Sequence, residues 1–507
     1  MSIQPPKGTV RDWIDHRAAE TPNVISHIFA DEGGVALTWA DLRDAVRGVS
    51  ERLAGLGAEK GESIAICLPN GRMGITCLFG TLYGGFRATP LNLAAGAAAM
   101  GYAITHSRAR FALVGTAQSE LFQDALTAEP ADITTIPVGS EINWPTTQMA
   151  ELAEVNTRDH ALLMYTSGTT GRPKGVVHDQ ASLLAGGWTP TIAHELTATD
   201  RALCVLPFYH INGLCVTLMG PLVSGGSVIV AEKFSLSRFW RHCRDHGATW
   251  FSVVPTIISH LLHGPENPDE ATRARLRFAR SASAPLAVET QTAFEERFNI
   301  PIVETMGLTE TAAQMLSNPL PPAMRKVGSP GVAIGNETTI LNDGAIAPAN
   351  VAGEIAVRGP NVMKEYLFNE DATRETFTND GWLLTGDLGV MDEDGYVFVT
   401  GRRKELIIKG GENIAPREID EALYHHKDVV EAAAFARPCP SYGQRVEAAV
   451  RLADGVHVSE ADLIALCVHH VGAFKAPDRV HIMAELPKGP SGKIQRLKLA
   501  EVLLANA

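Results

Sequence analysis

The sequence predicts an α/β protein in which parallel-rich sheets are covered by helices and a smaller α+β unit follows. Short apolar segments, such as 64–68 and 250–254, alternate with longer helical patterns up to about residue 327. Strands separated by helices form parallel sheets with helices on their faces. The 507 residues exceed what one hydrophobic core supports, and this length favours about three domain-sized units.

The first elements can be predicted individually. Residues 9–58 predict a helix, a β-hairpin and a second helix, with Thr38 as the cap of the second helix. A buried strand is expected at 64–68, because this apolar run is bounded by turn residues, and a helix is expected at 72–86. Further buried strands are expected at 109–114, 202–206, 227–231, 250–254 and 278–281.

The character of the sequence changes near residue 327. Glycines, prolines and short β-rich pieces such as 353–357 predict a small antiparallel or barrel-like subdomain. Beyond Gly401 we expect an α+β unit with a helix that begins at Pro416 and strands at 429–435 and 446–453. The predicted organisation is a domain at 1–400 with its β-rich subdomain at 327–400, a connection at 401–404, and a domain at 405–507.

Composition excludes several classes of function. The net charge of −13 argues against a nucleic-acid partner, because the phosphate backbone would be repelled. Seven scattered cysteines without a CxxC pair indicate buried reduced thiols, typical of a cytoplasmic protein. No signal peptide and no apolar run of about 20 residues is present, so no membrane span is expected. The oligomeric state is left open, and a homodimer is one possibility.

The most informative segment is 165–176, with the sequence YTSGTTGRPKGV. Glycines let backbone N–H groups approach a ligand, hydroxyl groups donate hydrogen bonds, and Lys174 supplies positive charge, so the segment is suited to polyphosphate. It lacks the spacing of a Walker A loop. The alternative interpretation is an ordinary turn rich in glycine, serine and threonine.

Further motifs follow in order: MGLTE at 306–310, TGD at 385–387, GRRKELIIKGGENIAPREIDE at 401–421 and PKGPSGK at 487–493. Together with 165–176 they resemble the adenylate-forming superfamily, which includes acyl-CoA synthetases, luciferases and the adenylation domains of peptide synthetases. The resemblance extends from about residue 37 to 493 and favours the acyl-CoA synthetase branch. It implies a large N-terminal domain and a small mobile C-terminal lid.

The resemblance implies a reaction in two steps. A carboxylic acid and ATP give acyl-AMP and pyrophosphate, and coenzyme A then gives acyl-CoA and AMP. Because two anions must meet in the first step, the site needs a phosphate cradle, Mg²⁺ and a movable positive charge. The expected catalytic residues are Lys493, Lys174, Thr309 and Glu310. Oxygen atoms of Thr166 and Glu310 are the expected contacts of the magnesium ion.

The resemblance also implies the residues that bind ATP and AMP. Asp387 is expected to accept hydrogen bonds from the ribose hydroxyls. Met306 stands where the family commonly stacks an aromatic ring on adenine, and its sulfur can pack on a purine with weaker selectivity. The complete set is Thr166, Ser167, Gly168, Thr169, Thr170, Gly171, Lys174, Ser283, Ala284, Pro285, Met306, Gly307, Thr309, Asp387 and Arg402.

Two features of the 401–421 motif concern the second step. Gly410 and Gly411 are expected to line the tunnel for the pantetheine arm of coenzyme A, where a side chain would block passage. Lys404 is the expected hinge between the two domains. The alternative is that 402–404 is simply a solvated run of charge.

The expected acyl pocket contains His210, Val254, Arg280, Ala282 and Met306, with Trp188 nearby. Ala282, Trp188 and Met306 reduce its volume, which favours a short acid. Arg280 either faces the pocket, where it would bind a second anionic group of a dicarboxylic or sulfonated acid, or lies on the surface. His210 is either a pocket wall or a core histidine. Two other functions stay open: a ligase that passes the acyl group to a carrier protein or another acceptor, and a non-catalytic nucleotide-binding homologue.

Overall fold

The computed structural model describes residues 4–145, 148–166, 173–453, 455–489 and 494–505. Within these residues, the largest sheet has nine strands in the order β15-β14-β13-β12-β11-β9-β10-β1-β2. The pairs from β1 through β10, β9, β11 and β12 to β13 are parallel. The strands are β1 (Ile25–Phe29), β2 (Val35–Thr38), β9 (Arg201–Cys204), β10 (Ser227–Val230), β11 (Trp250–Val253), β12 (Phe278–Ser281), β13 (Ile302–Leu308), β14 (Ala313–Ser317) and β15 (Val332–Ala333).

A second parallel-rich sheet has seven described strands in the order β19-β8-β7-β4-β3-β5-β6. Only its β19–β8 and β8–β7 pairs are antiparallel. The strands are β3 (Ser63–Cys67), β4 (Arg87–Pro90), β5 (Phe111–Gly115), β6 (Thr134–Val138), β7 (His160–Thr166), β8 (Lys174–Asp179) and β19 (Glu365–Tyr366). The strands β7 and β8 therefore bring the two ends of the glycine-rich segment together.

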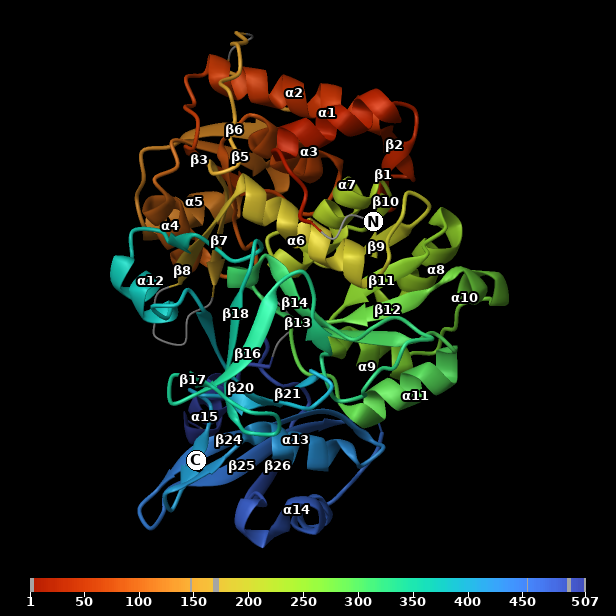
Figure 1. Ribbon diagram of the computed structural model, residues 1–507, viewed down its shortest axis with the longest axis vertical. Helices are drawn as coiled ribbons and strands as arrows, with labels where there is room; N and C mark the ends of the chain where they lie inside the picture. The colour runs from red at the N-terminus through yellow and green to blue at the C-terminus, as the bar shows by residue number, and fades with distance from the viewer. Residues whose placement is uncertain (1–3, 146–147, 167–172, 454, 490–493, 506–507) are drawn as a thin grey trace.

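Helix α6 (Gln180–Ala193) lies between the two sheets and contacts β14 of one and β7 and β8 of the other (Figure 1). It packs closely because a Cβ atom at Gly186 would lie 2.6 Å from that of Ala312. The other helices of this part are α1 (Val10–Glu20), α2 (Trp39–Gly55), α3 (Arg72–Tyr83), α4 (Ala97–Ser107), α5 (Ser119–Ala128), α7 (Gly220–Ser224), α8 (Leu236–His246), α9 (Pro255–His263), α10 (Glu270–Arg275) and α11 (Val288–Phe298). A π-helical segment, η2 (Asn212–Met219), precedes α7.

Two further sheets complete the described fold. The antiparallel order β17-β16-β18-β20-β21 contains β16 (Glu337–Asn342), β17 (Ala345–Ile346), β18 (Gly353–Arg358), β20 (Leu383–Met391) and β21 (Val397–Arg402), with α12 (Glu370–Thr376) beside it. The last sheet contains β22 (Ile407–Lys409), β23 (Glu412–Ile414), β24 (Val429–Cys439), β25 (Gly443–Leu452) and β26 (Arg479–Ile482), with α13 (Pro416–Tyr424), α14 (Glu460–Lys475) and α15 (Arg496–Ala505). It forms the small blue domain of Figure 1.

The predicted fold class is confirmed, and the differences are local. Strand β12 has the expected bounds, and Thr38 caps α2 through its side chain. Helix α3 ends at Tyr83, before the predicted residue 86, because Gly84 and Gly85 follow. Strand β24 runs to Cys439, beyond the predicted 435, because its outer half pairs with the start of β25. No helix in the described part of the chain is long and apolar enough to cross a membrane.

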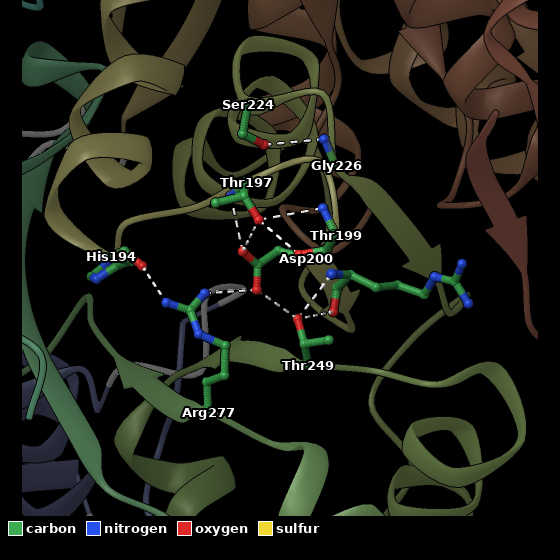
Figure 2. Close-up of polar contacts among 9 residues, drawn as sticks. His194, Thr197, Thr199, Asp200, Ser224, Gly226, Thr249 and Arg277 are labelled. Carbon is green, nitrogen blue, oxygen red and sulfur yellow. Dashed lines mark hydrogen bonds and ion pairs between the residues drawn. The ribbon is translucent and has the colours of Figure 1, made fainter. Parts of the chain in front are cut away.

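A buried carboxylate anchors the end of α6 to the largest sheet (Figure 2). Asp200 accepts hydrogen bonds from Arg277 Nη1 at 2.7 Å and from Thr249 Oγ1 at 3.0 Å. Arg277 Nη2 also donates to the backbone carbonyl of His194, which follows α6, at 3.1 Å. The position of His194 is thereby fixed relative to the starts of β9, β11 and β12.

Candidate active site

A cavity lies where the largest sheet, the β20–β21 pair and the C-terminal domain meet. Its walls come from the residues after β12, the end of β13, the start of α9 and the first turns of α13. It brings together eight residues that the sequence analysis singled out from five separate segments: Val254, Ser283, Ala284, Pro285, Met306, Gly307, Asp387 and Arg402. The C-terminal domain contributes Ile494, so the chain reaches this cavity immediately after residue 493.

Asp387 and Arg402 face each other on neighbouring strands. They are cross-strand partners in β20 and β21, and Arg402 Nε donates to Asp387 Oδ1 at 2.8 Å. The charge of Asp387 is the main cause that raises the pKa of Arg402 above its ordinary value, and Glu405 and Glu310 add to it. The Asp387 Oδ2 atom accepts no hydrogen bond from the described residues. An acceptor oxygen at the cavity is what two ribose hydroxyls require.

Glu310 is linked through Tyr366 to the strand that ends the glycine-rich segment. It follows β13 in the short 3₁₀ helix η3 (Thr309–Thr311), and its Oε1 accepts a hydrogen bond from Tyr366 Oη at 2.7 Å. The Nζ atom of Lys174 lies 4.4 Å from the centre of the Tyr366 ring. Thr166 pairs with Lys174 across β7 and β8. Tyr366 therefore joins the glutamate to the strand that carries Lys174.

This arrangement fits a magnesium ion, since carboxylate and hydroxyl oxygens are the ligands that Mg²⁺ prefers. No group of three or more His, Cys, Asp or Glu side chains suited to a metal occurs among the described residues. Thr309 is fixed nearby, because its carbonyl lies 2.7 Å from His178 Nε2 of β8. Ser167, Gly168, Thr169, Thr170, Gly171 and Lys493 lie outside the described residues.

Gly307 and Ser283, two residues of the predicted nucleotide site, have unusual local backbone environments. A Cβ atom at Gly307 would lie 1.2 Å from the carbonyl oxygen of Ala313, so the approach of β13 to β14 requires glycine there. Ser283 has a positive φ of 74° although it is not glycine. Met306 is half-buried and lines the cavity.

Arg280 is buried, so the alternative of a surface arginine is wrong. Its side chain is 1% exposed on β12. It donates to Gln314 Oε1 at 3.0 Å, to Asn212 Oδ1 at 2.8 Å and to Ser252 Oγ at 2.9 Å. These partners are neutral, and burial lowers the pKa of Arg280 to about 9. Gln314 carries no signal in the sequence beyond being a polar residue inside an apolar strand.

Only some of the acyl-pocket candidates line the cavity. Val254 and Met306 line the cavity, whereas Arg280 and Ala282 are buried and do not. Trp188 is buried on α6. Its ring packs against Gly335, where an added Cβ atom would lie 2.6 Å from the ring. The ring of His210 is half-buried, and its centroid lies 4.9 Å from that of Tyr209.

Gly410 and Gly411 form the two-residue turn between β22 and β23. Their φ angles of 61° and 87° favour glycine regardless of any tunnel. Both are exposed and lie outside the cavity, so their place in a pantetheine tunnel stays a prediction. Lys404 is exposed in the turn between β21 and β22, and its hinge role also stays a prediction.

Contacts between the domains hold this arrangement. His425 Nδ1 lies 2.7 Å from Glu289 Oε1 of α11, and Arg417 Nη1 donates to the Val399 carbonyl at 2.7 Å. Within the C-terminal domain, Arg496 pairs with buried Asp420 and lies 3.3 Å from Glu405. Arg496 and Asp420 both line the cavity.

Comparison with known proteins decides the family. The model of the AMP-binding enzyme family matches residues 14–367, and the model of the AMP-binding enzyme C-terminal domain matches 418–493. The chain belongs to the AMP-binding enzyme family. The predictions of the family, and of an enzyme of the acid–CoA ligase class, are thereby confirmed, and the alternative of a non-catalytic homologue is not supported.

Relatives within the AMP-binding enzymes match over almost their entire length. The sulfoacetate–CoA ligase of Cupriavidus necator is 44% identical over 97% of this chain and 97% of its own. The oxalate–CoA ligase of Arabidopsis thaliana is 36% identical over 93% of this chain and 94% of its own. The structure of the o-succinylbenzoate coenzyme A synthetase from Bacillus subtilis with ATP and magnesium has a TM-score of 0.84 and 30% identity, covering 96% of this chain and 98% of that one.

Proposed function

We propose that this AMP-binding enzyme joins a short carboxylic acid carrying a second anionic group, such as a sulfonated or dicarboxylic acid, to coenzyme A. ATP and coenzyme A are its co-substrates and Mg²⁺ its metal. The names of relatives that match over nearly the whole chain support both the thiol acceptor and an anionic acid. They favour coenzyme A over a carrier protein as acceptor.

The observation that carries the choice of acid is the burial of Arg280. Arg280 is 1% exposed, and no carboxylate pairs with its guanidinium among the described residues. With a pKa of about 9 it remains charged at neutral pH. A buried charge without a counter-ion is costly, and an anionic group on the acid would supply that counter-ion through a charge-assisted hydrogen bond. A neutral acid would leave the charge uncompensated.

In the first step, the carboxylate oxygen attacks the α-phosphorus of ATP, and the bond to the β-phosphate oxygen breaks to release pyrophosphate. Lys493 neutralises charge between the two anions, and Lys174 with the 166–171 segment holds the phosphates. Thr309 contacts the α-phosphate. Thr166 and Glu310 would hold a Mg²⁺ ion, which would neutralise phosphate charge when bound. Asp387 and Arg402 hold the ribose, and Met306 packs on adenine.

In the second step, the thiol of coenzyme A loses its proton to water, its sulfur attacks the acyl carbonyl, and the bond from the acyl carbon to the phosphate oxygen breaks to release AMP. We assign Lys404 as the hinge that exchanges the two active arrangements, with domains at 1–400 and 405–507. A cytoplasmic location is part of the same proposal, and a homodimer stays a prediction.

The test is a screen of acids by pyrophosphate release in the presence of ATP, Mg²⁺ and coenzyme A. Sulfoacetate, malonate and succinate should be used in preference to acetate, propionate and dodecanoate, with AMP and a thioester as products. Preference for dodecanoate would contradict a short acid. Preference for acetate or propionate would contradict the anionic acid, and ADP as product would contradict the reaction itself.

A further inference from the structure

The side-chain amide of Gln314 lies at the centre of the buried polar network around Arg280. Gln314 is on β14 and is 0% exposed. Its Oε1 atom accepts a hydrogen bond from Arg280 Nε at 3.0 Å and lies 3.2 Å from His194 Nε2. The proposed function assigns no role to Gln314 or to His194.

The orientation of this amide is determined by its two neighbours. A guanidinium carries only donors, so the Gln314 atom that faces Arg280 must be the oxygen. Burial, and secondly the charge of Arg280, hold the pKa of His194 well below its ordinary value, so its ring is neutral. The His194 Nε2 atom then carries the proton and donates to the same oxygen. Rotating the amide would place its NH₂ group against two donors.

The amide nitrogen is therefore directed away from both neighbours. Gln314 Nε2 is buried and has no hydrogen-bond partner in the described part of the chain. Arg280 Nη2 likewise donates no hydrogen bond to a described residue. Buried donors are almost always paired in native proteins, so the buried, unpaired Nε2 of Gln314, next to an Nη2 with no described acceptor, indicates an acceptor from outside the chain.

A chain of hydrogen bonds runs from the cavity to the guanidinium of Arg280. Ser283 and Gly307 line the cavity, and Gly307 is the cross-strand partner of Gln314. Asn212 Nδ2 lies 3.2 Å from Ser283 Oγ, and Asn212 Oδ1 accepts a hydrogen bond from Arg280 Nη1 at 2.8 Å. The path leaves the cavity next to Met306, where the nucleotide is proposed to lie.

The contacts in Figure 2 fix His194 from the other side. Arg277 Nη2 donates to the His194 carbonyl, and Arg277 is itself held by Asp200. The imidazole ring packs on Phe278, with 5.0 Å between the ring centroids. The His194 ring therefore has a defined place, and its N–H fixes the Gln314 oxygen.

We propose that Gln314 determines specificity by donating from Nε2 to the distal anionic group of the acid, beside Arg280 Nη2, and that His194 is the positioning residue that holds the amide in this orientation. The proposal rests on the proposed function and extends it to a two-donor site. It differs from a purely structural role for Gln314, in which only the hydrogen bonds accepted by Oε1 would be needed.

The variant Gln314→Glu separates the donor role of Nε2 from the acceptor role of Oε1. A carboxylate keeps an acceptor oxygen for Arg280 and His194 but replaces the donor by a second acceptor. The ratio of kcat/KM for the best anionic acid among sulfoacetate, malonate and succinate to that for acetate should fall about 100-fold, chiefly through the KM of the anionic acid. Gln123→Glu makes the same change of charge at an exposed position of α5 and should leave the ratio unaltered.

His194→Phe keeps a ring against Phe278 and removes the N–H, so the same ratio should fall by about 10-fold. An unchanged ratio in Gln314→Glu would overturn the proposal and leave the proposed function intact. If the wild-type enzyme releases pyrophosphate with none of the anionic acids, the proposed function fails instead. A crystal structure of the wild-type enzyme with the best acid and AMP decides the matter without a variant. The distal group should lie within hydrogen-bonding distance of Gln314 Nε2, and any other position refutes the assignment.

Discussion

Replacing Arg280 by methionine should leave the protein at least as stable while removing its preference for an anionic acid. Burial lowers the pKa of Arg280 from 12.5 to about 9. At 1.36 kcal/mol per pKa unit, holding the charge inside the folded protein costs up to about 5 kcal/mol. The hydrogen bonds to Gln314, Asn212 and Ser252 offset about 1 kcal/mol each.

The net expectation for Arg280→Met is a gain of about 2 kcal/mol in the free energy of unfolding, since the unbranched methionine fills similar space. The oxygen atoms that accept hydrogen bonds from Arg280 keep other partners in this variant. Gln314 Oε1 keeps His194 Nε2 at 3.2 Å, and Asn212 Oδ1 keeps Ser252 Oγ at 3.1 Å. The gain should shrink above pH 9, because unfolded arginine keeps its proton to higher pH and the wild-type protein therefore gains stability as pH rises.

Urea and thermal unfolding at pH 7.5, together with kcat/KM from pyrophosphate release, check both parts. For the anionic acid kcat/KM should fall about 100-fold, while the KM for ATP is unchanged. Arg277→Met is the matched contrast. Arg277 pairs with buried Asp200 at 2.7 Å, so its loss should lower the free energy of unfolding by about 2 kcal/mol. If Arg280→Met lowered the free energy of unfolding as much as Arg277→Met and kept the preference for an anionic acid, the role of Arg280 would be purely structural.

The remaining predictions concern the reaction centre and its electrostatics. Lys493→Ala should slow acyl-AMP formation about 10²–10³-fold but still convert supplied acyl-AMP and coenzyme A to the thioester, and equal loss in both half-reactions would refute the division. Tyr366→Phe removes the hydrogen bond to Glu310 and should raise the Mg²⁺ concentration for half-maximal pyrophosphate release several-fold; an unchanged Mg²⁺ titration would separate Tyr366 from the metal. Burial raises the pKa of Glu304, and a raised carboxyl pKa means stability that is present at low pH and lost as pH rises through the folded value. Glu304→Gln should therefore be more stable than the wild-type protein by roughly 1–2 kcal/mol at pH 8 and by little at pH 4, and a difference independent of pH would contradict this assignment.

The contiguous motifs were readable from the sequence because their chemistry depends on neighbouring residues. The segment at 165–176, the MGLTE and TGD motifs and the 401–421 run each place their functional groups within a few positions of one another. Strand β12 was predicted with its observed bounds because a buried parallel strand is a short apolar run between turns. The fold class and the family followed from the order of these local patterns.

The reasons for some glycines could not be read in this way. Gly307 is predicted to belong to the nucleotide site, and the contact that requires glycine there is with Ala313 on the neighbouring strand. Gly410 and Gly411 are predicted to line a tunnel, and the structure adds a second reason for glycine, since their positive φ angles belong to a two-residue hairpin. A sequence shows that a side chain is absent, and only the packed structure shows which neighbour would have met it.

Arg280 shows what could be predicted from the sequence and what required the tertiary structure. By itself the sequence determined that a cation ends an apolar strand near the expected acid site, and it left a surface position open. Only the tertiary structure decided that this cation is buried among Asn212, Ser252 and Gln314. The physical reason is that the cost of a buried charge depends on groups contributed by strands and helices far apart in the chain, and no local pattern records which of them will surround it.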